Sequence, residues 1–123
     1  MAKWVNDAAL DAALDYLDQS NIMHLCSAQP ATYAGIAAVS LGSVAMTPDT
    51  DFPKSDGDVS GRKFTVAAKS GVSVTASGTV THVALARTTD STLRYVMTTT
   101  PLAVTSGGTV NVPSWIVEQR DPI

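Results

Sequence analysis

The residues after Ser20 form short apolar runs broken by Gly, Ser, Thr, Asp and Pro, and this pattern constrains the fold more than any other feature of the sequence. Short runs rich in β-branched and aromatic residues, bounded by turn-forming residues, are typical of β-strands. We expect strands at residues 22–27, 37–46, 62–69, 71–78, 81–87, 93–99 and 109–118. About seven short antiparallel strands predict a mainly β fold, either a β-sandwich or a small barrel.

The alternation within the predicted strand at 81–87 indicates which of its faces is buried. Thr81, Val83 and Leu85 are together more apolar than the residues between them, so we expect them to face inward. Turns before the last strands are predicted at "DSTLRYV" and "SGGTV". Pro113 cannot donate a ladder hydrogen bond, and it therefore indicates an edge position or a bulge.

One amphipathic helix, at about residues 7–19, precedes the strands. Its apolar stripe at helical spacing is Leu10, Ala13, Leu14 and Leu17. The opposite face carries Asp11, Asp15 and Asp18. Asn6 is the expected N-cap, Val5 can pack on Leu10 as a hydrophobic staple, and Asn21 is the expected left-handed stop. Acidic residues near the C-terminal end oppose the helix dipole, so docking of the leucine stripe should hold the helix.

Length and composition exclude several classes of protein. The 123 residues suit a single β-rich domain, 1–123, with short terminal arms. The single cysteine excludes an intrachain disulfide and a cysteine-only zinc cluster. The net charge of −3 argues against nucleic acid as a partner. Aspartates among the first 18 residues argue against a signal peptide, and no run is long enough for a membrane helix. We therefore expect no nucleic-acid and no membrane partner.

The segment "SDGDVSGRKF", residues 55–64, partly matches a calcium-binding loop. Counted from Asp56, it offers oxygen ligands at Asp58 and Ser60 and a glycine at the sixth position, Gly61. The twelfth position, where such a loop needs a bidentate Glu, is Ala67. We therefore expect no metal and no cofactor here, and read the segment as a turn into a strand, with its Asp and Ser side chains bonding nearby backbone N–H groups.

Two groupings of nucleophile and base can be drawn from the sequence, and neither predicts an enzyme. His24 and Cys26 lie on one face of a strand and would point in parallel rather than converge. His82 and Asp90 could join one of many serines in a triad, but serine is so common here that the coincidence carries no information. We expect no catalytic residues.

Five aromatic residues are scattered along the chain and could form a sugar-binding platform. They are Trp4, Tyr16, Tyr33, Tyr95 and Trp115. Scattered aromatics in a small β-domain more often belong to the core or to an interface.

Several segments together resemble a group of small virion proteins of tailed bacteriophages, which share them in the same order. They are "WVNDAALDAALDYL", "LCSAQPATYAG", "SDGDVSGRKFTV", "GTVTHVALA" and "AVTSGGTVNVPSWIVEQRDP". The resemblance covers nearly the whole chain, although the shared motifs are turns and strands with no chemical signature. It implies a component of a phage particle, made in the host cytoplasm and located in the virion.

Among such components, size, acidity and the lack of catalytic residues best suit a head decoration (cement) protein. The resemblance then implies a non-enzymatic protein on the outside of the assembled capsid, with the major capsid protein as partner and a homo-oligomer, preferably a trimer, as the binding unit. The alternative is a tail or baseplate component, such as a carbohydrate-binding adhesin module.

The two ends of the chain are the candidate contacts with the capsid or with a neighbouring subunit. These residues are Met1, Ala2, Lys3, Trp4, Val5, Arg120, Asp121, Pro122 and Ile123. Both ends lie outside the regular pattern and could add a strand to a neighbour's sheet edge. The alternative is that they are frayed termini without a partner.

Overall fold

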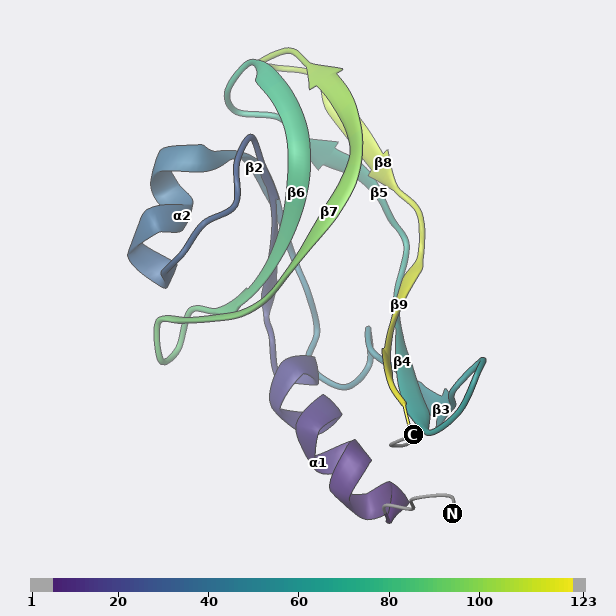
Figure 1. Cartoon of the computed structure of the whole chain (residues 1–123). Helices are drawn as coiled ribbons and strands as arrows, with labels where there is room; N and C mark the ends of the chain where they lie inside the picture. The colour runs from purple at the N-terminus through teal and green to yellow at the C-terminus, as the bar shows by residue number, and fades with distance from the viewer. Residues whose placement is uncertain (1–5, 121–123) are drawn as a thin grey trace.

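The computed structural model describes residues 6–120, and the chain is a small β-sandwich with an N-terminal helix, as the sequence predicts. One layer is a four-stranded sheet, and the other combines a three-stranded sheet with a two-stranded ribbon (Figure 1). Every pair of strands is antiparallel. The two layers bury a shared apolar core.

The four-stranded layer has the strand order β2-β1-β6-β7. Its strands are β1 (Ile22–Cys26), β2 (Ser40–Ala45), β6 (Gly78–Arg87) and β7 (Thr92–Val104). Val83 and Leu85 of β6 are buried in the core as expected, but Val80 and Ala84 of the alternate face are buried as well. Thr81 is only half-buried, because the register between β6 and β7 shifts beside it.

The second layer contains the sheet β3-β4-β9 and the ribbon β5-β8. Its strands are β3 (Lys54–Asp56), β4 (Arg62–Val66), β5 (Lys69–Ser73), β8 (Thr109–Val112) and β9 (Trp115–Gln119). A single bridge between Gly42 and Val74 links β2 to the chain just beyond β5. A Cβ at Gly42 would lie 2.4 Å from the Ser73 carbonyl oxygen, so only glycine allows this approach.

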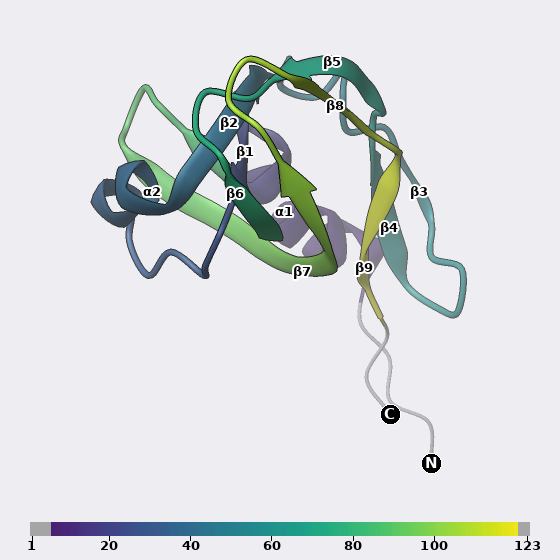
Figure 2. The same ribbon diagram turned by 90° about the horizontal axis from the view of Figure 1, so that it is seen from above.

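Helix α1 (Asp7–Asp18) packs against β4 and β9 below the sandwich (Figures 1 and 2). Leu10 and Leu14 are buried and Leu17 packs on the core, whereas Ala13 is exposed. Asn6 is the N-cap as expected, since its Oδ1 accepts the Ala8 N–H at 2.8 Å. The predicted staple residue Val5 lies outside the described residues.

The acidic face of α1 is not simply solvated, which corrects the prediction for Asp18. That side chain is fully buried, and the Lys54 ammonium donates to it at 2.5 Å and to Asp15 at 2.6 Å. Arg62 donates to Asp11 at 2.9 Å. Two cations from β3 and β4 therefore tie the acidic face of the helix to the second layer.

The expected stop at Asn21 is also wrong. The helix ends with Gln19 as the C-cap, at φ −81°, and the positive-φ non-glycine residues of the described chain are Asp49 and Ser91. Asn21 instead binds Thr88 across the sheet, donating through Nδ2 and accepting the Thr88 N–H at Oδ1.

A second helix, α2 (Tyr33–Val39), replaces the first part of the strand predicted at 37–46. Thr32 caps it by accepting the Gly35 N–H at 3.1 Å, and Ile36 is buried. Ala37 and Ala38 are strong helix formers, so once the cap had set the helix start they continued it. The strand begins only at Ser40.

The other predicted strands also have different bounds; β6 begins earlier, at Gly78, and β7 is longer, from Thr92 to Val104. The runs at 62–69 and 71–78 divide into β4 and β5, and the run at 109–118 divides into β8 and β9 on either side of Pro113. At Pro113 the chain leaves the β5-β8 ribbon for the other sheet, so this proline marks a change of sheet. The predicted turns lie where expected, between β6 and β7 and between β7 and β8.

Candidate functional site

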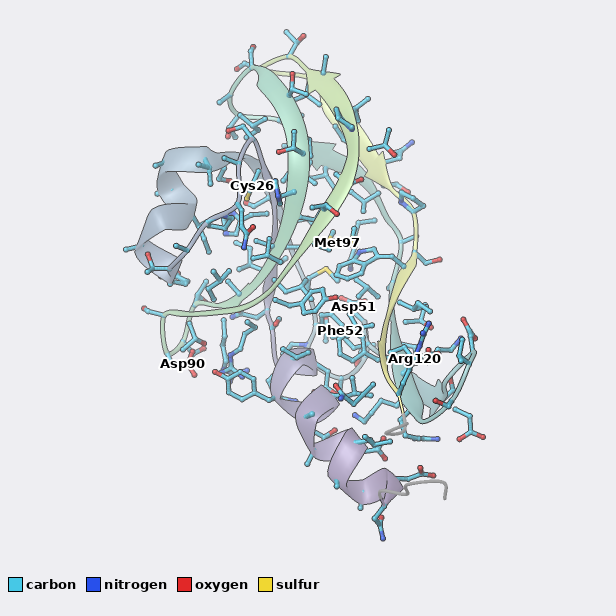
Figure 3. The ribbon with its side chains drawn as sticks, viewed as in Figure 1. Cys26, Asp51, Phe52, Asp90, Met97 and Arg120 are labelled. Atoms are coloured by element: carbon cyan, nitrogen blue, oxygen red, sulfur yellow. The ribbon has the colours of Figure 1, made fainter. Side chains whose placement is uncertain are left out.

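Of the nine candidate contact residues at the chain ends, only Arg120 is described. Met1, Ala2, Lys3, Trp4, Val5, Asp121, Pro122 and Ile123 lie outside residues 6–120. Arg120 is exposed, and its Nε donates to Oε2 of Glu118 at 2.5 Å (Figure 3).

Both ends of the described chain lie at the same end of the molecule. Arg62 of β4 binds Asp11 of α1 and is also the register partner of Gln119 on β9. The start of α1 and the end of β9 are close together in both ribbon views (Figures 1 and 2). Any partner that contacts the start of α1 is therefore near the end of β9.

The segment 55–64 forms a turn fastened by ion pairs. Asp56 accepts from Arg62 Nη1 at 2.9 Å and Asp58 from Lys63 Nζ at 2.5 Å. The Gly57 N–H donates to the Gly61 carbonyl at 2.9 Å, and Gly61 has φ +69°, so both glycines serve the turn as predicted.

The carboxylates of Asp56 and Asp58 bind cations rather than the expected backbone N–H groups, and Glu118 accepts the Val59 N–H. Within residues 6–120 no three His, Cys, Asp or Glu side chains gather around a common point.

Burial keeps the side chains of both His24 and Cys26 in their uncharged forms. The Cys26 thiol is fully buried, and burial raises its pKa to about 11. The thiol is therefore protonated at neutral pH. Burial lowers the pKa of His24, whose Nδ1 lies 3.0 Å from the Ser40 hydroxyl.

His82 and Asp90 do not meet. The His82 Nδ1 lies 2.8 Å from the hydroxyl of neighbouring Thr81. Asp90 lies in the turn after β6, where its carboxylate binds Arg94 at 2.7 Å (Figure 3).

The aromatic residues do not form one platform. Tyr95 of β7 stacks on Trp115 of β9, with ring centroids 5.9 Å apart. Tyr16 of α1 instead carries the Arg94 guanidinium 3.8 Å above its ring, and Tyr33 lies on α2. Trp4 lies outside the described residues. The stack of Tyr95 and Trp115 joins the two layers.

A slot between β7 and β8 is one of the concave features of the described surface. The two strands are joined by the turn at 105–108, yet they do not pair with each other. Instead they diverge from the turn (Figure 2). The deeper part of the slot is a cavity of about 150 Å³ lined by Val83, Met97 and Val112, among others. Towards the turn it widens into a hollow of about 420 Å³ that includes Leu102 and Thr109. We call this feature the β7/β8 slot.

Both ends of the β7/β8 slot are closed by specific contacts. At the turn, the Ser106 N–H donates to the Ser77 hydroxyl and the Gly107 N–H to the Val74 carbonyl, each at 2.9 Å. At the other end, the stack of Tyr95 and Trp115 bridges β7 and β9. Figure 3 shows Met97 reaching from β7 into the space between the layers. The slot is thus a bounded feature of the fold.

The indole N–H of Trp115 is buried in the wall of this slot without a hydrogen-bond partner, the one such side-chain atom in the described part of the chain. An unmade bond at a buried donor costs about 1 to 3 kcal/mol. No motif in the sequence predicted the slot, although Pro101 in "TTTPLAV" cannot donate a ladder hydrogen bond and so indicates an unpaired strand edge.

Comparison with protein-family models, with curated proteins and with solved structures gave no match for this chain. Within residues 6–120, neither helix has the length and apolar character needed to span a bilayer.

Proposed function

We propose that this protein is a non-enzymatic structural component of a tailed-bacteriophage particle that binds the outside of the assembled capsid and stabilises it. The observation that carries the proposal is the resemblance of nearly the whole chain to small virion proteins of such phages. The partner is the major capsid protein, and the binding unit is a homo-oligomer, with a trimer favoured.

The arrangement of the chain ends supports this role. The start of α1 and the end of β9 lie together, so one neighbouring surface can contact both ends of the described chain. Several modest contacts from a symmetric oligomer give strong binding only where the capsid subunits are correctly spaced. A protein built in this way would bind the assembled shell in preference to free capsid subunits.

The proposed mechanism is mass action. Packaged DNA pushes outward on the shell, and a ligand that binds only the assembled lattice stabilises that lattice in proportion to its occupancy. No covalent step and no cofactor are needed.

The test compares phage particles with and without this protein. Particles that lack it should assemble but release DNA at a lower temperature, and adding back the purified protein should restore the release temperature. If particles without it kept full heat resistance but failed to adsorb to host cells, the alternative of a tail or baseplate adhesin would replace the proposal.

A further inference from the structure

The β7/β8 slot is walled by strand edges that the fold leaves unpaired. β7 ends the four-stranded sheet, β8 ends the ribbon, and β9 ends the three-stranded sheet. An unpaired edge offers backbone N–H and C=O groups to an added strand. Two such edges that diverge from one turn can take a strand between them.

The side chains of the slot select what kind of segment fits. None of the residues that line its cavity or its outer hollow is charged, and Leu102 at its mouth is 49% exposed. The Trp115 N–H is buried in the slot wall without an acceptor, and a shift of the indole on binding would let a backbone carbonyl of an inserted segment accept from it. The fitting occupant is an extended, mainly uncharged peptide.

The chain itself contains a segment of this kind outside the described residues. Residues 1–5, "MAKWV", have one charged side chain, Lys3, and include an aromatic anchor, Trp4. The C-terminal residues 121–123, "DPI", include an acid and a proline that cannot donate a ladder hydrogen bond. β8 is four residues long, a length that a five-residue segment can cover.

Residues 1–5 cannot fill the slot of their own chain. They precede Asn6 at the Gln119 end of β9, whereas the slot begins at Trp115, the opposite end of that strand. Five residues span at most about 17 Å, and β9 alone takes up about that length. Residues 1–5 are therefore too short to reach the slot of their own chain. The segment that fills the slot must come from another molecule.

We infer that the β7/β8 slot binds residues 1–5 of a second copy of this chain as an added strand, with a backbone carbonyl accepting the Trp115 indole N–H. Repeated around a symmetry axis, this exchange builds a closed homo-oligomer. The inference does not depend on the capsid role, because it concerns only contacts between copies of the chain.

The test uses the chain lacking residues 1–5, in which Trp115 is the one remaining tryptophan. In ¹⁵N-labelled protein, the single indole resonance is followed while the unlabelled peptide Met-Ala-Lys-Trp-Val amide is added. We expect a saturable downfield shift. In parallel, sedimentation equilibrium should show that the full chain self-associates at least about tenfold more tightly than the shortened chain.

Two matched arginine substitutions separate the slot from the rest of the surface. Leu102→Arg places a charge at the mouth of the slot, whereas Ile116→Arg alters a similarly exposed apolar residue outside its lining. Leu102→Arg should weaken peptide binding at least about tenfold and Ile116→Arg should leave it unchanged, with both variants melting as cooperatively as the parent.

Three results would overturn the inference. One is an indole resonance that does not move with peptide, and another is an equal effect of the two arginine substitutions. The third is self-association that survives removal of residues 1–5 but is lost in Leu102→Arg, which would mean that another part of the second copy fills the slot.

Discussion

At the scale of single residues, the ion pair between Asp18 and Lys54 is the electrostatic contact whose loss we expect to destabilise the fold most. The Asp18 side chain is fully buried, whereas Lys54 is 23% exposed. Burial raises the pKa of Asp18, and the hydrogen bonds from Lys54 and Gln19 oppose that rise. A buried carboxylate that loses its cation is far more costly than a surface one. The pair is therefore a contact on which the docking of α1 depends.

We predict that Lys54→Met destabilises the protein by about 3 kcal/mol at neutral pH, because it leaves Asp18 buried without a cation. The matched control is Arg62→Met, which removes the pair with Asp11 on the same helix. Both partners of that pair are partly solvated, so its loss should cost clearly less. Urea unfolding of the two variants measures the difference, and equal losses would contradict the special role of Asp18.

The same variant should respond to pH in a defined direction. Without Lys54 the folded-state pKa of Asp18 rises further above the unfolded value of about 3.9. The folded state then binds the proton more tightly, so stability is retained at low pH and lost as pH rises through the folded pKa. The deficit of Lys54→Met relative to the parent should therefore be smaller at pH 4 than at pH 7. A deficit independent of pH would mean that Asp18 is not its source.

At the scale of elements, the leucine stripe of α1 decides whether the helix belongs to the domain or to an interface. Leu14 is 1% exposed and belongs to the core cluster with Phe52 and Phe64. We predict that Leu14→Ala costs about 2 to 5 kcal/mol, through lost burial and the cavity left behind. Thermal or urea unfolding checks this. Unchanged stability together with lost oligomerisation would show that the stripe is an interface.

Local signals in the sequence predicted the elements that have strong periodicity. The stripe at Leu10 and Leu14 and the cap at Asn6 identified α1, and alternation in β6 identified Val83 and Leu85 as core residues. Helix α2 was missed because it is seven residues long and contains Gly35, so its periodicity is short and its cap at Thr32 precedes a β-like run.

Features that depend on tertiary contacts could not be predicted from local sequence patterns. Asp18 reads as a surface residue of an amphipathic helix, and its burial follows from Lys54, which is 36 residues away in the chain. The β7/β8 slot exists because two strands joined by a four-residue turn do not pair with each other. The periodicity of a strand does not predict which other strand it pairs with. The contact roles of the terminal residues, Arg120 included, stay a prediction.

At the scale of the whole molecule, the two proposals use different surfaces. The start of α1 and the end of β9 lie together at one end, and the slot opens between unpaired strand edges on β7 and β8. A neighbour's segment in the slot would link copies of the domain, while the remaining surfaces stay available to a capsid. Self-association and capsid binding therefore use different contacts, and each has its own test.

The most direct test of the proposed function is co-sedimentation of the purified full chain with emptied capsids and, separately, with isolated tails of the same phage. Capsids stripped of this protein should bind it saturably, at stoichiometry fixed by the lattice, whereas free capsid subunits and tails should not. Binding to tails without binding to capsids would contradict the capsid-decoration role.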